Sequence, residues 1–155
     1  MKLFAIASLL LLFSSPVAAS DWRFVTSTER TAFAVETSGI RREGTMAFAW
    51  MVLANHHRGE PLNDYQVGLV AFDCSRSRMN FESLLSYRWP RELLDRGDRQ
   101  PPFDIPPDST WAQLLGLICH NTYPLDQFAA WPTAEAFADV ALSGGIRAAT
   151  EAIRR

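Results

Sequence analysis

The sequence predicts an α+β fold: an antiparallel sheet of about five or six strands with one helix packed on a face, and a helical C-terminal extension. Several short segments alternate in side-chain character with a period of two, which is typical of strands. One later segment has the three-and-four spacing of an amphipathic helix. The only two cysteines, Cys74 and Cys119, end one strand segment and that helix, so a bond between them would join strand to helix.

Residues 1–20 have the pattern of a signal peptide. A single lysine precedes the apolar run 3–13, and small residues follow it where a signal peptidase cleaves. The run is shorter than the ~18 residues of a membrane-spanning helix. We expect cleavage after Ala19 or Ser20, so that the mature chain begins near Asp21 with no integral membrane segment. A short membrane anchor is the alternative.

The mature chain has the size of one ordinary domain. The full chain has a net charge of −2, and its only lysine lies in the signal segment. A weakly acidic chain without a basic block is not expected to bind nucleic acid. We therefore expect a protein partner, and the sequence leaves the partner's identity and the oligomeric state open.

Two cysteines in an exported chain predict one disulfide, between Cys74 and Cys119. The loss of chain entropy in the unfolded state then suggests about 4 kcal/mol of stabilisation. Two other interpretations stay open at this point. Cys119 and His120 could form a nucleophile pair, or both cysteines could bind a metal together with His120.

Five segments have the alternation or apolar content of strands. They are residues 22–26, 31–36, 45–53, 65–72 and 79–87. Between them, the glycine-containing segment 37–44 predicts a turn, and 55–63 predicts a polar loop. The charged, proline-containing segment 88–104 predicts a mobile loop, with room for a short edge strand at 92–94.

The segment 45–53 is apolar on both faces. One face carries large side chains and the other mostly small ones, so we expect the large face in the core and the small face under partial cover. The expected core residues are Met46, Phe48, Trp50 and Val52.

Two helices follow. Asp108 or Ser109 caps the first, whose apolar face consists of Trp111, Leu114, Leu115 and Ile118. A linker after Asn121 runs through Pro124 and Trp131. Thr133 then caps a second helix over 134–142, which the glycines at 144 and 145 end. Residues 146–155 are expected to continue as a frayed helix.

Several of these pieces occur together in one order. They are Asp21-Trp22, the segment 38–44, the strand with Trp50, Phe72-Asp73-Cys74 with the arginines after it, and 105–109 leading to Cys119. Over residues 21–120 the chain resembles the bacterial surface-adhesin protein E family. The resemblance implies an exported domain with a helix on an antiparallel sheet, and a disulfide joining strand to helix. It also implies binding of host proteins at the cell surface. Residues 121–155 form a helical extension outside it.

Two groups of residues are candidate binding sites. Arg96, Gly97 and Asp98 form the integrin-binding tripeptide on an expected exposed loop, and chance occurrence is the alternative. Arg41 and Arg42 could present a paired cationic contact for carboxylate or phosphate. The alternative is a solvated turn in which one of them pairs with a nearby acid.

Trp89 and Trp131 stand beside prolines and could be interface aromatics, which protein partners favour. Burial under the loop or under the C-terminal helix is the alternative. His56 and His57 could bind a metal or respond to pH, although loop histidines without further ligands usually do neither.

The expected function is that of a non-catalytic exported binding protein of a Gram-negative envelope, in the periplasm or at the cell surface. It would act through loop 88–104 and the sheet edge. The alternative is a periplasmic structural or accessory domain that docks through its C-terminal helix. The sequence contains no pattern of a catalytic triad, metal set or phosphate loop, so we expect neither an enzyme nor a cofactor.

Overall fold

The computed structural model describes residues 20–58, 62–122 and 130–146. Its strands are β1 (Trp22–Ser27), β2 (Thr31–Glu36), β3 (Arg41–Glu43), β4 (Met46–Asn55), β5 (Tyr65–Asp73), β6 (Arg78–Arg88), β7 (Glu92–Gly97) and β8 (Phe103–Asp104). Its helices are α1 (Thr110–His120) and α2 (Ala134–Leu142). The predicted α+β class is confirmed.

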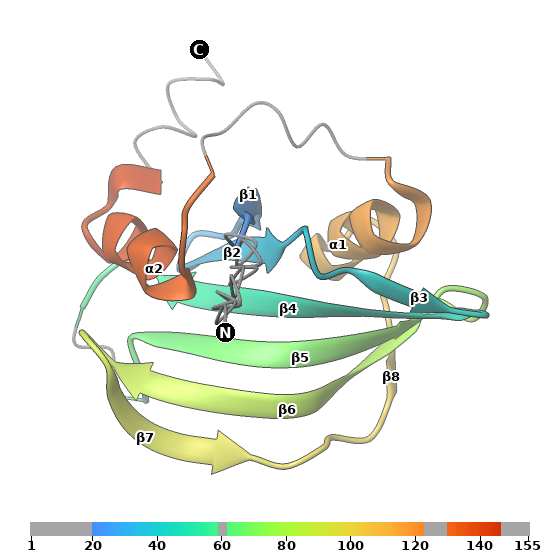
Figure 1. The fold of residues 1–155 in the computed structure, drawn as a ribbon, viewed down its shortest axis with the longest axis horizontal. Helices are drawn as coiled ribbons and strands as arrows, with labels where there is room; N and C mark the ends of the chain where they lie inside the picture. Colours follow the sequence, from blue (N-terminus) through green and yellow to red (C-terminus); the bar gives the residue numbers. More distant parts are fainter. Residues whose placement is uncertain (1–19, 59–61, 123–129, 147–155) are drawn as a thin grey trace, which may run out of the picture.

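The strands form one antiparallel sheet in the order β1-β2-β4-β5-β6-β7 (Figure 1). β3 pairs with the first part of β4, and β8 pairs with the start of β6. The five predicted strands are all present. The turn predicted at 37–44 needs correction, because it contains β3. Within 88–104 the short edge strand at 92–94 is confirmed as part of β7, which is longer than expected, and β8 was not predicted. These three strands are short or highly charged, and their pairing with a longer neighbour defines them.

The face of β4 that was predicted to be the core is the wrong one. The side chains on the opposite face, Ala47, Ala49 and Met51, are fully buried. They belong to a cluster that includes three residues of α1, which are Leu114, Leu117 and Ile118. By contrast, Trp50 is 40% exposed. Small side chains let a helix approach the sheet closely, and the helix supplies the bulk that fills the core. Of the predicted core face only Val52 is fully buried.

This reversal predicts opposite sensitivities at two neighbouring residues of β4. Ala49→Leu should lower the free energy of unfolding by about 1–3 kcal/mol, because the added carbons have no space under α1. Trp50→Ser should cost about 1 kcal/mol or less, because the ring is partly in solvent. Urea unfolding of both variants measures the difference. A larger loss for Trp50→Ser than for Ala49→Leu would contradict the assignment of the faces.

The sequence signals for α1 are confirmed. The Ser109 hydroxyl caps the helix by accepting a hydrogen bond from the backbone N–H of Ala112, at 3.1 Å. The predicted apolar stripe faces the sheet, with Leu117 added to it and Trp111 only partly buried. The helix ends at Asn121 in the left-handed conformation, with φ of 53°.

The disulfide between Cys74 and Cys119 is present, with 5.6 Å between the two Cα atoms. It joins the residue after β5 to the last turn of α1, as predicted. Because Cys119 is oxidised, the nucleophile pair with His120 and the shared metal site are both ruled out.

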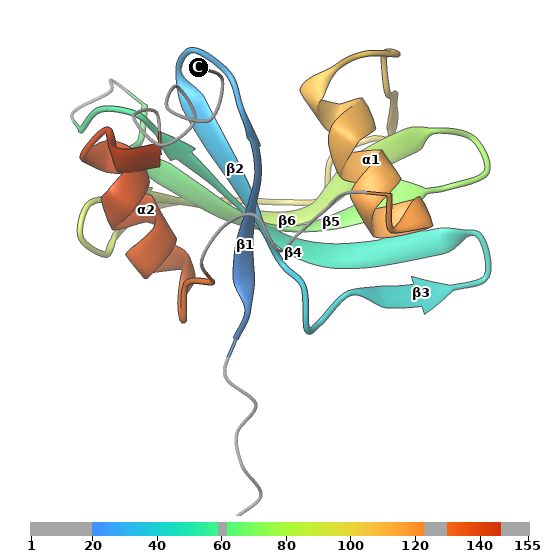
Figure 2. The same ribbon diagram turned by 90° about the horizontal axis from the view of Figure 1, so that it is seen from above.

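α2 forms a second core on the other face of the same sheet. Phe137, Ala138 and Ala141 are fully buried in a cluster with Ala32 and Ala34 of β2, among other residues. The other side of β2 carries Phe33 and Val35, which belong to the α1 cluster. The β1–β2 ribbon therefore lies between the two helices (Figure 2).

Thr133 caps α2 as predicted, and its hydroxyl accepts a hydrogen bond from the N–H of Ala136 at 3.0 Å. Trp131 was expected in a linker, but it pairs with β1 through two backbone hydrogen bonds to Trp22, of 3.0 and 3.1 Å. Gly144, with φ of +78°, follows the helix. The rest of the linker at 123–129 and the expected frayed helix beyond residue 146 lie outside the described residues.

Candidate protein-binding face

One face of the central sheet carries partly exposed apolar side chains. Trp50 on β4 lies opposite Leu69 on β5, and in the next row Val67 of β5 lies opposite Leu85 of β6. Directly opposed residues of neighbouring strands point to the same side. Together with Phe48, all of these side chains are intermediate or exposed. We call Phe48, Trp50, Val67, Leu69 and Leu85 the open face.

Four residues of the open face, Phe48, Trp50, Leu69 and Leu85, belong to neither helix cluster, whereas Val67 at its border packs against the α2 cluster. α1 packs on the opposite side of β4, and α2 packs toward the end of β4 that carries Val52 and Ala54. At the outer edge of the sheet, Leu93 of β7 is 47% exposed. It lies opposite Tyr87, which is on the same side of the sheet. A contiguous apolar surface of this kind is typical of a binding site.

Two of the predicted arginines lie beside the open face, in different places. Arg41 lies opposite Phe48, and its guanidinium carbon is 4.8 Å from the centre of that ring. Arg96 of the outer strand β7 lies opposite Leu85 of β6, on the same face of the sheet. Each therefore contributes positive charge at the border of the apolar surface, where a polar rim is typical of an interface.

Arg41 and Arg42 do not act as a pair. They were expected in a turn, but they are successive residues of β3 and so point to opposite sides of the sheet. Arg41 forms an ion pair with Glu43 at 2.8 Å. Arg42 instead donates a hydrogen bond from Nε to the carbonyl of Ile118 in α1, at 3.0 Å. The paired cationic contact is therefore wrong, and the alternative with a local acid is correct for Arg41.

The integrin-type tripeptide is not on a loop as expected. Arg96 and Gly97 belong to β7 and pair with Leu85 and Leu84 of β6. Only Asp98 lies beyond the strand. The three residues are at the sheet edge, and the ladder with β6 determines the backbone of the first two.

Trp89 lies in an aromatic group at the α2 end of the sheet. Tyr65 and Tyr87 stack with 4.9 Å between ring centres, and Trp89 meets Tyr65 edge-on at 6.4 Å. Arg58 lies over Trp89, with its guanidinium carbon 4.9 Å from the ring centre. Trp89 is half-buried and packs against the α2 cluster. Partial burial thus accounts for it, and Trp131 likewise packs edge-on against Phe137 at 5.1 Å.

Tyr65 should titrate at a higher pH than an unperturbed tyrosine. Its ring is 1% exposed and its hydroxyl donates a hydrogen bond to the carbonyl of Pro90 at 3.0 Å. Burial, with the nearby charges of Glu135 and Tyr87, raises its pKa from 10.0 to about 12. The unfolded chain releases the phenol proton at a lower pH than the folded chain does. The contribution of the buried, neutral phenol to the free energy of unfolding is therefore lost as the pH rises from about 10 through about 12.

Alkaline titration of the phenolate absorbance checks this. A step near pH 12 should be present in the folded protein, and Tyr65→Phe should remove it. The denatured protein is the control, since all of its phenols should ionise near pH 10. Ionisation of all three near pH 10 in the folded protein would contradict the burial of Tyr65.

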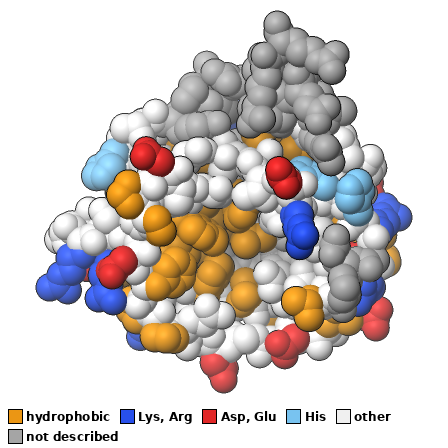
Figure 3. All heavy atoms as spheres, turned by 180° about the vertical axis from the view of Figure 1, so that it is seen from behind, with side chains coloured by type: hydrophobic (Ala, Val, Ile, Leu, Met, Phe, Trp, Pro, Cys, Tyr) orange, Lys and Arg blue, Asp and Glu red, His pale blue; other side chains and the backbone are white. Residues whose placement is uncertain are grey.

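A second apolar group surrounds Trp111. Its ring meets Phe33, Phe81 and Phe103 edge-on at 5.6, 5.9 and 6.4 Å between centres. Trp111 and Leu84 are half-buried, so this group reaches the surface in part. Figure 3 shows the molecule from behind, and hydrophobic side chains gather near the centre of that view. We assign the Trp111 group a packing role, because the Trp111 ring on α1 packs against rings from β2, β6 and β8.

The described residues hold no group of three or more His, Cys, Asp or Glu that could hold a metal ion. His56 was expected in an exposed polar loop, but it is 1% exposed, and its Nε2 lies 3.1 Å from the carbonyl oxygen of Thr28. His57 beside it is exposed. In the described part of the chain no helix is long and apolar enough to cross a membrane.

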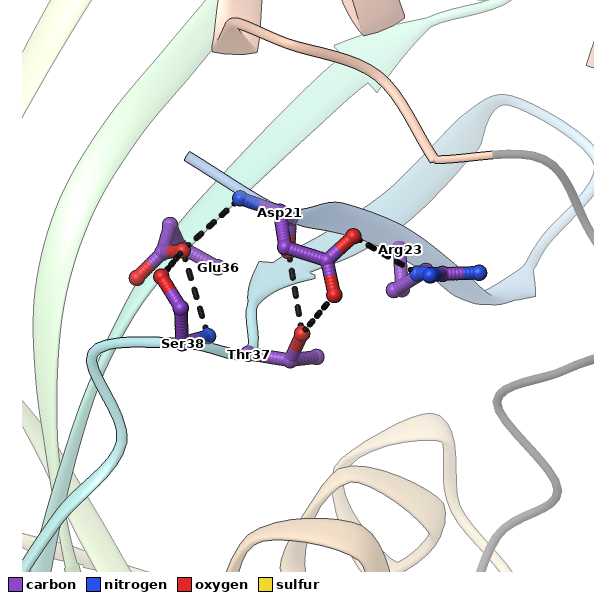
Figure 4. A network of polar contacts seen from close by, with 5 residues as sticks. All are labelled: Asp21, Arg23, Glu36, Thr37 and Ser38. Carbon is purple, nitrogen blue, oxygen red and sulfur yellow. Dashed lines mark hydrogen bonds and ion pairs between the residues drawn. The ribbon is translucent and has the colours of Figure 1, made fainter. Parts of the chain in front are cut away.

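Sequence reasoning missed a polar network at the start of β1. Asp21, Arg23, Glu36, Thr37 and Ser38 are linked by hydrogen bonds and one ion pair (Figure 4). The network joins residues about fifteen positions apart. Their only sequence signal is a polar cluster at the end of an apolar strand, and a turn explains that equally well.

Comparison of the chain with protein-family models, curated proteins and solved structures found no match. The geometry of the chain itself therefore carries the functional argument.

Proposed function

We propose that this chain is an exported, non-catalytic domain of the bacterial envelope that binds a protein partner through the open face. The observation that carries the proposal is the 40% exposure of Trp50 in the centre of a strand, directly opposite the apolar residue Leu69 of β5. A tryptophan is costly to leave in water, and this residue type is enriched among the strongest contributors to protein–protein affinity.

The border of this surface supports a protein partner in particular. Arg41 and Arg96 place cations beside the apolar residues, and arginine is enriched at protein interfaces. The open face has neither the basic stripe that nucleic acid needs nor a cluster of nucleophile and base. The proposed site differs from the one expected from sequence, which was the loop 88–104 together with the sheet edge, since the open face lies in the middle of the sheet.

Export is supported by the predicted signal peptide together with the disulfide, because such bonds persist mainly in oxidising compartments. The resemblance to surface-adhesin protein E favours a place at the cell surface. A periplasmic accessory role remains the alternative. It was expected to use the C-terminal helix for docking, but the apolar side of α2 is already buried in the second core. An accessory role would therefore also use the open face.

Site-specific photo-crosslinking in cells tests the binding surface. A photoreactive phenylalanine analogue at Trp50 should give a discrete adduct with another protein, whereas the same group at Gln113 should not. Gln113 is the matched control because it is exposed on α1, on the other side of the sheet. Equal adducts from both positions, or none from Trp50, would contradict the proposed surface.

Cell fractionation with surface proteolysis tests the location. A surface adhesin should be cleaved when protease is added to intact cells. A periplasmic accessory protein should be protected and then released by osmotic shock. Retention of the full-length chain in the cytoplasm would contradict export altogether.

A further inference from the structure

The backbone of Asp21 is held at the very start of the described sheet. Its carbonyl accepts hydrogen bonds from the N–H and the hydroxyl of Thr37, at 2.9 and 3.1 Å. Its carboxylate accepts from the same hydroxyl at 2.7 Å and from Nε of Arg23 at 2.8 Å. Its backbone nitrogen donates to Oε1 of Glu36 at 2.9 Å (Figure 4). Ser20, one residue earlier, is exposed.

Glu36 is a carboxylate that lacks a cationic side chain. It is 8% exposed, and none of the ion pairs among the described residues includes it. Its hydrogen-bond partners are the backbone nitrogens of Asp21, Ser38 and Gly39 and the hydroxyl of Ser38. A buried carboxylate is costly unless a cation compensates its charge, so a positive charge at the position of the Asp21 nitrogen would complete this site.

The charge state of Glu36 agrees with this geometry. Burial alone would raise the pKa of its carboxyl, but the hydrogen bonds from Ser38, Asp21 and Gly39 outweigh burial and hold the pKa below its ordinary value. Glu36 is therefore an anion at neutral pH, and its Oε1 faces the nitrogen at which the chain would begin after cleavage.

We propose that a signal peptidase cleaves between Ser20 and Asp21, and that the amino group released at Asp21 forms an ion pair with the Glu36 carboxylate. Water hydrolyses the peptide bond, so Ser20 keeps the new carboxylate and Asp21 gains the amine. The amine takes up a proton at neutral pH, since an α-amino group has a pKa of about 8. Ala18 and Ser20 supply the small residues that such a peptidase needs.

Cleavage thereby adds a positive charge to the donor of a hydrogen bond whose acceptor, the Glu36 carboxylate, is already negative. The amide N–H of the precursor donates one hydrogen bond to Glu36, whereas an ammonium group donates from the same place with a full positive charge. The gain on cleavage is the Coulomb attraction between the ammonium group and the carboxylate, which is stronger at a site shielded from water than in bulk water. Removal of the signal should therefore stabilise the folded domain through Glu36. This inference rests on the proposed export, because only an exported chain meets the peptidase.

The intact mass of the chain purified from the cell envelope identifies the cleavage site. We expect the mass of a chain that begins at Asp21. A chain that begins at Ser20 would overturn the proposed site. A precursor that stays uncleaved in the cytoplasm would instead contradict export, so the two failures are distinguishable.

A thermal double-mutant cycle tests the ion pair independently of export. Two purified proteins, released from a fusion so that they begin at Asp21 or at Ala19, are each compared with their Glu36→Gln variants. The substitution should lower Tm by at least about 3 °C more in the protein that begins at Asp21. A smaller difference would overturn the ion pair.

Ser38→Ala is the matched control. It removes a different hydrogen bond to the same carboxylate, so its effect on Tm should be equal in the two proteins. If Ser38→Ala reproduced the full difference shown by Glu36→Gln, the effect would belong to the loop rather than to the amino group, and the proposal would be wrong.

Discussion

Replacing Cys74 and Cys119 together by alanine should lower the free energy of unfolding by about 4 kcal/mol. The disulfide spans a sequence separation of 45 residues, and the segment between its ends contains β6, β7, β8 and nearly all of α1. Without the bond, the unfolded chain regains the conformational freedom of that long loop. For a domain with about 5–15 kcal/mol of net stability, the loss is a large share of the total.

Denaturant unfolding of the variant and of the parent protein measures this effect. Reductant provides the control, since it should lower the stability of the parent toward that of the variant and leave the variant unchanged. A loss below about 1 kcal/mol would mean that the buried contacts of α1 with the sheet suffice without the bond, contrary to the chain-entropy argument.

Phe137→Ala should cost about 3–5 kcal/mol, the usual range for deleting a buried aromatic ring. Phe137 of α2 is fully buried in the second core, and it packs edge-on against Trp131. Its loss would leave a cavity in the second core, and β2 shares its other side with the first core. We therefore expect the whole domain to unfold at lower denaturant concentration in one transition.

Asp139→Ala is the control for this substitution, because it changes the same helix on its exposed side. Asp139 forms an ion pair with Arg58 at 2.8 Å, and both side chains are more than half exposed. Surface pairs of this kind contribute about 0–1 kcal/mol. If Phe137→Ala produced a separate early transition and left the main one in place, the segment after residue 121 would be an appended extension rather than part of the core.

β4 contributes both to the core under α1 and to the open face. On one side of this strand, Ala49 is buried under α1. On the other side, Trp50 is partly exposed to solvent. If the large side chains of β4 were buried in the core under α1, this apolar surface would not exist. The reversed orientation of β4 is thus the reason that a candidate binding face exists.

The local residue pattern was sufficient to predict the strands and helices whose periodicity or capping residues lie within the segment itself. Alternation located the five longer strands, and the capping residues Ser109 and Thr133 located the starts of both helices. Two cysteines in a chain predicted to be exported were enough to predict the disulfide. In each case the determining interaction is either local in sequence or has one possible partner.

The tertiary structure alone decided the features that depend on which surfaces meet. Both faces of β4 are apolar, so its sequence could not determine which one α1 would cover. β3 and β7 exist because of hydrogen bonds to longer neighbours, and the tripeptide at 96–98 is on a strand for that reason. The contact between Asp21 and Glu36 joins two ends of a hairpin. Long-range pairing of this kind leaves no periodic signal in the residues, because it arises from packing between segments rather than within them.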